Sequence, residues 1–328
     1  MALGRRQWIS LSLGGMAACT RPLAALEPRL QWRERALLGF GTTLWLRAGH
    51  ADGSRVGAGL DAAVSAIRHV EQQMSLFNPS SALCRLNADG VLHKPHPHLV
   101  TVLNVARDVS ERSHGAFDVS IQPLWKLWAQ AARQGHAPTA AELAVARRLA
   151  DWRAIAVNEA SIKLGRPGMA LTLNGIAQGF AADLAKAALQ REGIAHALLN
   201  TGEWAPMGRS PEALPWTLGI ENPRSAENLV AKLQADGRAV ATSSDAHMSF
   251  SADHSHHHIL DPRTGSSPPE MASVTVLAES GALADALTKV FFMTPWNQTL
   301  AMARRWKVDV LVVDKGGRWQ ASSAVPLS

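Results

Sequence analysis

The sequence predicts an α+β fold in which β-hairpins are interleaved with amphipathic helices. Apolar residues recur at helical spacing between Leu60 and Met74, in the first third of the chain. In the second half, short strand patterns are separated by turn residues, as at Asp236-Gly237 and at Lys315-Gly316-Gly317. A doubly wound sheet would alternate single strands with helices, so these hairpin patterns favour the α+β class.

The first half of the chain is expected to begin with a strand over residues 39–47 and a turn over residues 51–53. An amphipathic helix follows and ends at the loop 75–79, which we expect to form part of a ligand-binding wall. The apolar face of this helix consists of Leu60, Val64, Ile67, Val70 and Met74. Further helices are expected around an apolar face at residues 99–109 and over residues 140–150.

Short strands are then expected over residues 154–157, 161–164 and 170–173, and the last runs directly into a helix over residues 175–191. Later strands are expected over residues 197–200, 216–220, 229–235, 238–243 and 273–278. Asp236-Gly237 predicts that the third and fourth of these later strands form one hairpin. A last hairpin of residues 308–313 and 318–321 closes the chain.

Net charge, apolar content and cysteine content disfavour several classes of protein. The formal net charge is +6, but arginines are scattered and no long basic run follows the N-terminal segment, which disfavours nucleic-acid binding. A mildly basic surface also suits an anionic dinucleotide. No apolar stretch is long enough to cross a bilayer, so no transmembrane segment is expected. Cys19 and Cys84 are the only cysteines, and loss of a leader would leave one thiol and no internal disulfide.

An export signal is expected over residues 1–25, with the functional domain over residues 26–328. Arg5-Arg6 precedes a short run of small and apolar residues, as in a secretory leader. Paired arginines followed by an aromatic and an aliphatic residue resemble a twin-arginine signal; an ordinary leader is the alternative. Lipid attachment at Cys19 is less favoured, because Met16, three residues before it, is a poor match to a lipid-attachment signal. The protein is therefore expected in the periplasm or outside the cell.

Two segments place polar groups where packing alone would not require them. In residues 171–180, a strand ends in glycines that allow close backbone approach, and helix N–H groups can face an anion. The alternative is a purely structural strand-to-helix turn. In residues 115–128, aromatic and polar side chains, Phe117 and Asp118 among them, surround a proline-broken turn. The alternative there is ordinary core packing.

A third segment, residues 256–265, places an imidazole directly before a strand residue. A histidine can act as general base for a hydroxyl nucleophile, because its pKa lies near working pH. The Asp-Pro turn that follows carries Arg263, which could bind a phosphate with two hydrogen bonds. The alternative is a histidine-rich metal-binding tract over residues 253–258.

The fourth segment is a largely apolar helix at residues 284–292. Asp285, Thr288 and Lys289 fall on one face of it. A carboxylate and a hydroxyl one turn apart are oxygen donors of the kind that magnesium takes, usually alongside phosphates and water. The alternative is a simple ion pair between Asp285 and Lys289 on a partly exposed face.

Together and in this order, these segments resemble the ApbE family, the FAD:protein FMN transferases, from about Phe40 to Phe292. The matching motifs are Phe40-Gly41-Thr42, Met74-Ser75-Leu76-Phe77 with Ser81 and Arg85-Leu86-Asn87, Phe117-Asp118 to Trp128, Gly175-Ile176-Ala177-Gln178-Gly179-Phe180 with Asp183, Ala241-Thr242-Ser243, His258 to Gly265, and Ala284-Asp285-Ala286-Leu287.

The resemblance implies a T-fold-like, two-lobed α+β protein that binds FAD between its lobes. It implies a Mg²⁺-assisted transfer of FMN from FAD to a Thr or Ser hydroxyl of an acceptor protein, with release of AMP. The acceptor would be a subunit of a flavin-dependent electron-transfer complex. The alternatives are a non-catalytic FAD-binding carrier or accessory protein, and an FAD pyrophosphatase in which water replaces the hydroxyl.

The resemblance also assigns roles to residues. His258 falls at the proposed base position. FAD contacts and pocket support are implied for Phe40, Phe77, Ala116, Phe117, Asp118, Thr172, Gln178, Asp183, Ser243 and Ile259. The metal would be held by the Gly175 carbonyl and the Asp285 carboxylate. Thr288 is a further candidate donor from its place on the helix, not from the family pattern.

The chain departs from the family pattern at several positions. Lys289 stands four residues after the metal-binding aspartate, where the family usually has Thr. Gln178 stands where many relatives have Lys, Ser244 replaces a common Gly, and Gly202-Glu203-Trp204 stands where Gly-Gly-Asp is common. We hypothesise that the Lys289 ammonium takes over part of the charge role of the metal.

Overall fold

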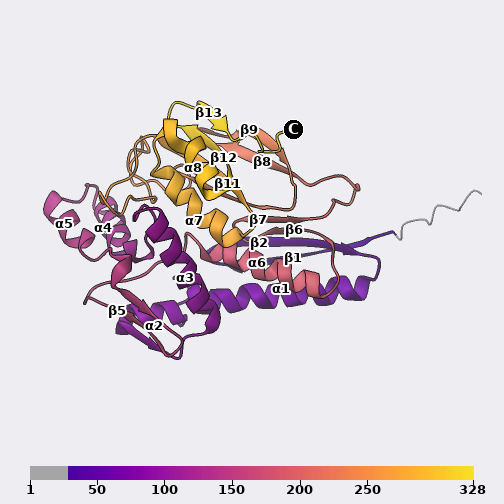
Figure 1. Ribbon diagram of the computed structural model, residues 1–328, viewed down its shortest axis with the longest axis horizontal. Coiled ribbons are helices and arrows are strands. Elements are labelled where there is room, and N and C mark those ends of the chain that lie inside the picture. Colours follow the sequence, from indigo (N-terminus) through magenta and orange to yellow (C-terminus); the bar gives the residue numbers. More distant parts are fainter. Residues whose placement is uncertain (1–28) are drawn as a thin grey trace, which may run out of the picture.

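An eight-stranded antiparallel sheet lies at the centre of the protein, whose computed structural model describes residues 29–328 (Figure 1). The strand order is β1-β2-β6-β7-β10-β11-β12-β13. These strands are β1 (Gln31–Gly39), β2 (Thr42–His50), β6 (His196–Asn200), β7 (Trp204–Met207), β10 (Ala239–Ser244), β11 (Met271–Ala278), β12 (Asp309–Asp314) and β13 (Trp319–Ala321).

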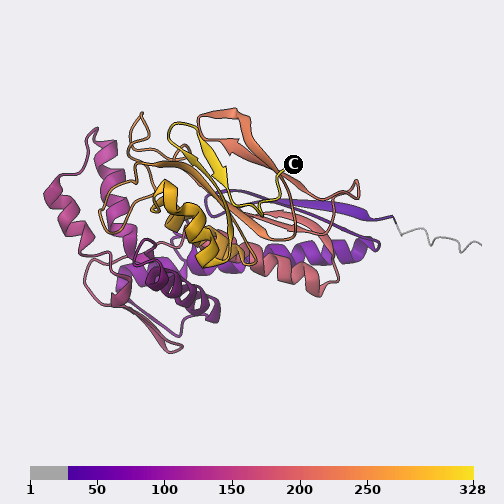
Figure 2. The ribbon, with the colours of Figure 1, turned by 45° about the horizontal axis from the view of Figure 1, so that its top comes forward.

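Both faces of this sheet are covered. One face packs against α1 (Gly53–Met74), α6 (Ala177–Arg191), α7 (Gly281–Phe292) and α8 (Thr299–Trp306) (Figure 2). On the other face, the hairpin of β8 (Thr217–Asn222) and β9 (Ser225–Gln234) encloses a smaller apolar cluster that includes Leu218. As a result, every residue of the central strand β11 is buried.

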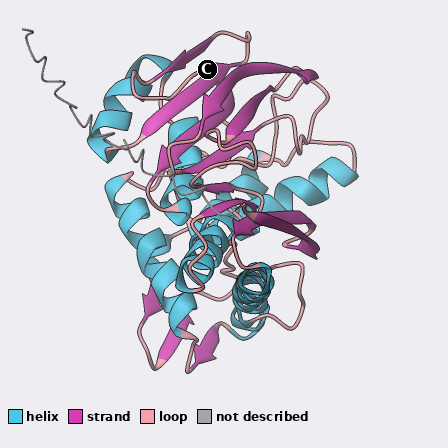
Figure 3. Ribbon diagram, turned by 90° about the vertical axis from the view of Figure 1, so that its right-hand side faces the viewer, coloured by secondary structure: helices cyan, strands magenta, loops and turns pink. Residues whose placement is uncertain are grey.

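The second lobe is mainly helical and lies between β2 and β6 in the sequence (Figures 1 and 3). It contains α2 (Ala82–Asp89), β3 (Val91–His93), α3 (Pro97–Arg112), α4 (Gln122–Arg133), α5 (Ala140–Arg147), β4 (Ile155–Val157) and β5 (Ser161–Leu164). Its three short strands form a separate sheet in the order β3-β5-β4. The predicted α+β class and the two-lobed arrangement are therefore confirmed.

Helix α1 connects the sheet to the helical lobe. It begins at Gly53 because the Asp52 carboxylate accepts a hydrogen bond from the Ser54 backbone N–H at 2.8 Å. Its predicted apolar face is largely buried, and it ends where Ser75 adopts an extended conformation. The loop that follows leads directly to Phe77, at the junction of the lobes.

Helices α6 and α7 approach each other closely through two glycines. A Cβ atom at Gly179 would collide with the Gly281 carbonyl oxygen. The Asp183 carboxylate, on α6, accepts hydrogen bonds from the Ser280 hydroxyl at 2.8 Å and from the backbone N–H groups of Gly281 and Ala282 at 2.6 and 3.1 Å. Asp183 thereby caps the N-terminus of α7 and fixes it against α6.

Replacing Gly179 with alanine is expected to lower the free energy of unfolding by about 1–3 kcal/mol or more. The new Cβ would collide with the backbone of Gly281, which cannot move aside as a flexible side chain could. Gly57→Ala in α1 is the matched control. The nearest atom to its new Cβ would be the flexible end of Arg33 at 3.3 Å, so the helix should gain up to about 1 kcal/mol. Urea unfolding of both variants measures the difference, and equal stabilities would contradict the close helix contact.

One predicted strand is wrong, and another is confirmed over most of its length but starts later than predicted. Residues 170–173 form no strand, because the Leu171 backbone N–H and carbonyl bond the Asn87 side chain at 2.6 and 2.8 Å instead of a neighbouring strand. The strand predicted over residues 39–47 is shifted, because Phe40 and Gly41, with φ of 51° and 78°, form the two-residue turn between β1 and β2.

The predicted hairpin at Asp236-Gly237 is also wrong. Strand β9 pairs with β8, whereas β10 enters the central sheet between β7 and β11. Strand β10 is buried along nearly its whole length, and the central sheet provides the apolar surroundings that such a strand requires.

The proline-broken turn predicted within residues 115–128 is replaced by a helix over residues 122–128. Pro123 lies in the first turn of α4, where a missing N–H is tolerated. The last hairpin, β12 with β13, is confirmed.

Within residues 29–328, no helix combines the length and the apolar character needed to cross a membrane. The predicted export signal over residues 1–25, including Cys19, lies outside the described residues.

Candidate active site

A cavity of about 480 Å³ lies where the two lobes meet. The helical lobe contributes the loop after α1 and residues 116–125. The sheet lobe contributes the end of β10, parts of the segment 247–262, and Lys289 from α7. Residues 172–178 approach from the connection between the lobes.

Most of the residues that the sequence singled out lie on the wall of this cavity. They are Phe77, Ala116, Phe117, Asp118, Thr172, Gly175, Gln178, Ser243, His258, Ile259 and Lys289. Four others do not line it: Phe40, Asp183, Asp285 and Thr288. Each of these four is linked to the site through its neighbours.

Phe77 presents an aromatic ring at the cavity, and the residue is 61% exposed. A Cβ at Gly41 would lie 3.0 Å from that ring, so the β1–β2 turn supports it closely. Phe40 is buried in the core, and its backbone N–H donates to the Glu71 carboxylate at 3.0 Å. Phe40 therefore fixes the turn, while Phe77 offers a surface on which a planar ring system can stack.

The Asp118 carboxylate orders the helical-lobe wall. One oxygen accepts hydrogen bonds from the Ser120 backbone N–H and hydroxyl at 2.8 and 2.6 Å, and the other accepts from the Trp152 backbone N–H at 3.0 Å. Burial raises the pKa of Asp118, and the hydrogen bonds from Ser120 oppose that rise. Asp118 caps the short 3-10 helix Val119–Ile121 and holds it against the cavity.

His258 is fixed in one orientation on the opposite wall. Its Nδ1 lies 3.0 Å from the Met248 carbonyl oxygen, which also accepts from the His258 backbone N–H at 3.0 Å. Because a carbonyl only accepts, Nδ1 is assigned the proton and Nε2 keeps its lone pair. Burial, opposed by the Met248 bond and assisted by the charge of Lys289, lowers the pKa of His258 to about 4. The ring is thus neutral at pH 7 and can accept a proton.

Its neighbour His257 is fully buried against Phe292, and neither ring nitrogen has a hydrogen-bond partner within the described part of the chain. Burial, followed by the charge of Lys315, lowers the pKa of His257 to about 4, and the charge of Asp245 opposes this. Between pH 6.5 and 4, the unfolded chain therefore binds a proton that the folded protein excludes.

The free energy of unfolding is accordingly expected to fall as the pH drops from 6.5 to about 4, by at most on the order of 3 kcal/mol from His257. His257→Leu should make this fall shallower, because the leucine cannot take up the proton in the unfolded chain. Urea titrations at pH 4.5 and 7 measure the effect; an unchanged pH dependence in His257→Leu would contradict the assignment.

Lys289 brings a positive charge to the cavity wall. Its Nζ donates to Asp285 Oδ1 at 2.6 Å and to the Asp285 carbonyl at 3.2 Å. The Asp285 side chain is fully buried, whereas that of Lys289 is 22% exposed. A Cβ at Gly175 would lie 2.9 Å from Lys289 Cε, so the lysine stem runs directly beside this glycine. The predicted polar face of α7 is therefore an ion pair, but a buried one.

Thr288 does not line the cavity, and its side chain bonds to the end of β10. Its hydroxyl donates to the Asp285 carbonyl at 2.7 Å, and its oxygen lies 2.8 Å from Ser243 Oγ. Because the Thr288 proton is already used, Ser243 is the donor in the second bond. This pair joins α7 to the end of β10, where Ser243 reaches the cavity wall.

Glu203 is a second buried carboxylate on the cavity wall. It is 7% exposed and accepts a hydrogen bond from the Thr242 backbone N–H at 3.0 Å. Burial and the charge of Asp285 raise the pKa of Glu203 well above its usual range, although Lys289 opposes the rise. Two buried carboxylates, Glu203 and Asp285, thus lie close to the Lys289 ammonium.

A family model described as the ApbE family matches residues 40–312, which is most of the chain. The chain belongs to the ApbE family. Two similar proteins are the FAD:protein FMN transferases of Klebsiella pneumoniae (strain 342) and Vibrio cholerae. The first is 30% identical over 76% of this chain and 80% of its own length, and the second 29% identical over 79% and 80%.

Solved structures support the same membership. The flavin transferase ApbE from Vibrio cholerae superposes with a TM-score of 0.77 at 26% identity, covering 90% of this chain and 98% of its own. The ApbE protein of Thermotoga maritima superposes with a TM-score of 0.80, covering 89% and 97%; at 23% identity this likeness concerns the fold alone.

In this ApbE protein, the residues expected to hold a metal are engaged by other groups. One Asp285 oxygen pairs with Lys289, and the other lies 3.3 Å from the Gly179 backbone N–H. Thr288 is bonded to Asp285 and Ser243. A magnesium ion beside Asp285 and Gly175 does not fit this arrangement unless the ammonium moves away.

Two residues of the cavity wall could not be predicted from the sequence. His247 and Met248 line the cavity from an irregular segment, and neither periodicity nor a motif identifies them. Trp125 also lines the cavity, and it belongs to the segment 115–128, whose aromatic and polar residues predicted a site. The histidine-rich tract over residues 253–258 forms no metal-binding group within the described residues. Of its members only His258 faces the cavity, and the His256 ring packs at a tilt against Trp128.

Proposed function

We propose that this protein transfers FMN from FAD to a Thr or Ser hydroxyl of an acceptor protein and releases AMP. The observation that carries the proposal is a single cavity in which the His258 base and the Lys289 ammonium both face the same space, beside an exposed aromatic ring at Phe77. The curated relatives that carry the name FAD:protein FMN transferase support it.

In this proposal the acceptor hydroxyl attacks the phosphorus of the FMN half of FAD. A new oxygen–phosphorus bond forms, the anhydride bond to AMP breaks, and the hydroxyl proton passes to His258 Nε2. The neutral ring suits this role, because its Nδ1 proton is held by Met248 and its lone pair is available. The flavin ring would stack on Phe77, which leaves the diphosphate toward the inner end of the cavity.

Lys289 supplies the positive charge that a diphosphate requires. Its ammonium is held by Asp285 while it remains on the cavity wall, so it offers a fixed charge close to developing negative charge on oxygen. We therefore propose that the ammonium takes over part of the role expected for Mg²⁺. The buried Glu203, whose neutral form is favoured, adds little negative charge to the same region.

The test mixes the purified protein, FAD and a candidate acceptor domain that carries a target threonine, with and without Mg²⁺. Intact-mass spectrometry of the acceptor should reveal the mass gain of one FMN, absent when the target threonine is replaced by valine. Free FMN with an unchanged acceptor would indicate a pyrophosphatase instead. FAD that binds and stays intact with every candidate acceptor would favour a carrier.

The place of action is part of this proposal. We propose that the protein is exported to the periplasm, supported by the arginine pair at residues 5–6, and that the acceptor is an exported subunit of a flavin-dependent electron-transfer complex. Fractionation of cells that produce the full-length chain would test the location, and a cytoplasmic product of uncleaved mass would contradict it.

A further inference from the structure

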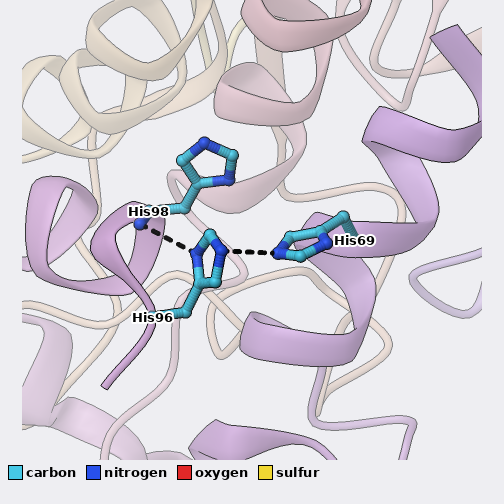
Figure 4. Close-up of side chains that lie close together, drawn as sticks. All are labelled: His69, His96 and His98. Atoms are coloured by element: carbon cyan, nitrogen blue, oxygen red, sulfur yellow. Dashed lines mark hydrogen bonds between the residues drawn. The ribbon is translucent and has the colours of Figure 1, made fainter. Parts of the chain in front are cut away.

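Three histidines meet where α1 approaches the start of α3, and none of them lines the cavity. His69 lies on α1, His96 is the residue that caps α3, and His98 lies in the first turn of α3. One ring nitrogen from each lies within 4.8 Å of the others, and all three side chains are half-buried. Figure 4 shows the three rings arranged around one space. We refer to these residues as the histidine triad.

The spacing of the triad suits a small cation. His69 Nε2 and His96 Nε2 are 3.0 Å apart, and the ring centroids of His96 and His98 are 4.7 Å apart. Two nitrogens that bind one Zn²⁺ at about 2.0–2.1 Å in tetrahedral geometry lie roughly 3.3 Å from each other. Small shifts of the three rings would therefore bring all three nitrogens to ligand distance.

The hydrogen bonds of the triad determine which ring nitrogens can bind a ligand. The His98 backbone N–H donates to His96 Nδ1 at 3.1 Å, so the neutral His96 ring carries its proton on Nε2 and donates to His69 Nε2. The His69 Nε2 lone pair accepts this hydrogen bond, and it becomes available to a ligand once the His96 proton leaves Nε2. His98 Nδ1 is buried and has no hydrogen-bond partner among residues 29–328.

His96 can join as third ligand when its proton moves from Nε2 to Nδ1. That change ends the hydrogen bond from the His98 backbone N–H, so metal binding by His96 is coupled to the start of α3.

We propose that the histidine triad is a binding site for a divalent transition-metal cation, Zn²⁺ above all, that joins α1 to the start of α3. Three imidazoles suit Zn²⁺, Ni²⁺ or Cu²⁺ better than Mg²⁺ or Ca²⁺, which take oxygen ligands. The fourth position would be taken by water, since the site is half-buried and three protein ligands leave one position open. The site is separate from the proposed transfer reaction, because no member of the triad lines the cavity.

The test measures Zn²⁺ binding to the untagged, metal-stripped full chain by isothermal titration calorimetry, with Co²⁺ absorption spectra as a second probe. One Zn²⁺ per chain is expected at the triad, and Co²⁺ should give the intense visible bands of tetrahedral coordination. His69→Gln and His98→Gln should each weaken Zn²⁺ binding by more than the roughly 10–100-fold that loss of an outer-shell partner causes. His93→Gln is the matched control, because His93 is exposed on β3 three residues before His96.

Thermal unfolding guards against variants that simply misfold. Excess Zn²⁺ should raise the Tm of the wild type and of His93→Gln, and should leave the Tm of His69→Gln and His98→Gln unchanged. Equal Zn²⁺ affinity in the wild type and in the two triad variants would overturn the proposal, and so would Co²⁺ spectra of octahedral type. In that case the triad is only a hydrogen-bonded contact between α1 and α3.

Discussion

Replacing His258 with alanine is expected to lower the rate of FMN transfer by about 10²–10⁴, the range that a positioned general base contributes, while FAD binds nearly as tightly as before. FAD binding should change little because, in the proposed reaction, the ring acts on the incoming hydroxyl and not on the bound dinucleotide. The measurement pairs initial rates of acceptor modification, followed by intact mass, with the Kd for FAD from flavin fluorescence.

The second histidine on the cavity wall separates this role from a general effect of charge or packing. His247 lines the same cavity but is exposed, so His247→Ala should cost far less than His258→Ala. A loss of equal size in both variants would contradict the assignment of the base. A loss of FAD binding in His258→Ala that matches the loss of rate would make the residue a ligand contact only.

The pH dependence of kcat/KM tests the role of His258 independently. Because the pKa of His258 is lowered to about 4, its neutral form persists well below the ordinary value of 6.5. The acid limb of kcat/KM is therefore expected near pH 4, measured in short assays before unfolding interferes. An acid limb near pH 6.5 that disappears in His258→Ala would show that the free protein holds this ring less desolvated than its burial indicates.

Removing the ammonium is expected to have the second large effect. Lys289→Ala should lower the transfer rate by about 10²–10³, as loss of one preorganised charge or donor does in other sites. The wild type should retain most of its activity in EDTA, because the lysine already occupies the position between Asp285 and Gly175. Rates with and without EDTA, compared for both proteins, measure the effect.

A matched substitution sharpens this prediction. Lys289→Thr places the usual family residue at the position and frees Asp285, so its transfer activity should depend strictly on added Mg²⁺. Removing the lysine leaves a fully buried carboxylate without its partner, so the Tm of each variant must accompany the rates. An absolute Mg²⁺ requirement in the wild type, together with an active Lys289→Ala, would contradict the proposed role.

The elements that could be predicted from the sequence are those with strong local signals. Helices α1 and α3 have long apolar faces, and both are confirmed. Strand β1 could not be identified in this way, since it is an edge strand with mostly exposed side chains and no clear alternation. The pairing of β9 and β10 was mispredicted for another reason: Asp236-Gly237 allows a hairpin locally, but burial in the central sheet decides the partner of β10.

The residues of the candidate site also divide into those with a local sequence signal and those placed by the tertiary fold. The contact of Asp285 with Lys289 could be predicted, because four residues on a helix bring side chains together. The position of Glu203 beside them could not, because Glu203 precedes β7 and lies far from α7 in the sequence, so that only the folded chain brings these groups together. The histidine triad combines both cases: His96 and His98 are close in sequence, but His69 comes from another helix.

The order of the strands has a consequence for how the protein is made. Strands β2 and β6 are hydrogen-bonded neighbours, yet the whole helical lobe is synthesised between them. Lys289 follows later still, on α7, near the end of the chain. A chain still emerging from the ribosome therefore contains Phe77 and His258 before it has the charge that completes the cavity. Pairings over such separations also form slowly, so the ability to hold a dinucleotide should appear only after synthesis is essentially finished.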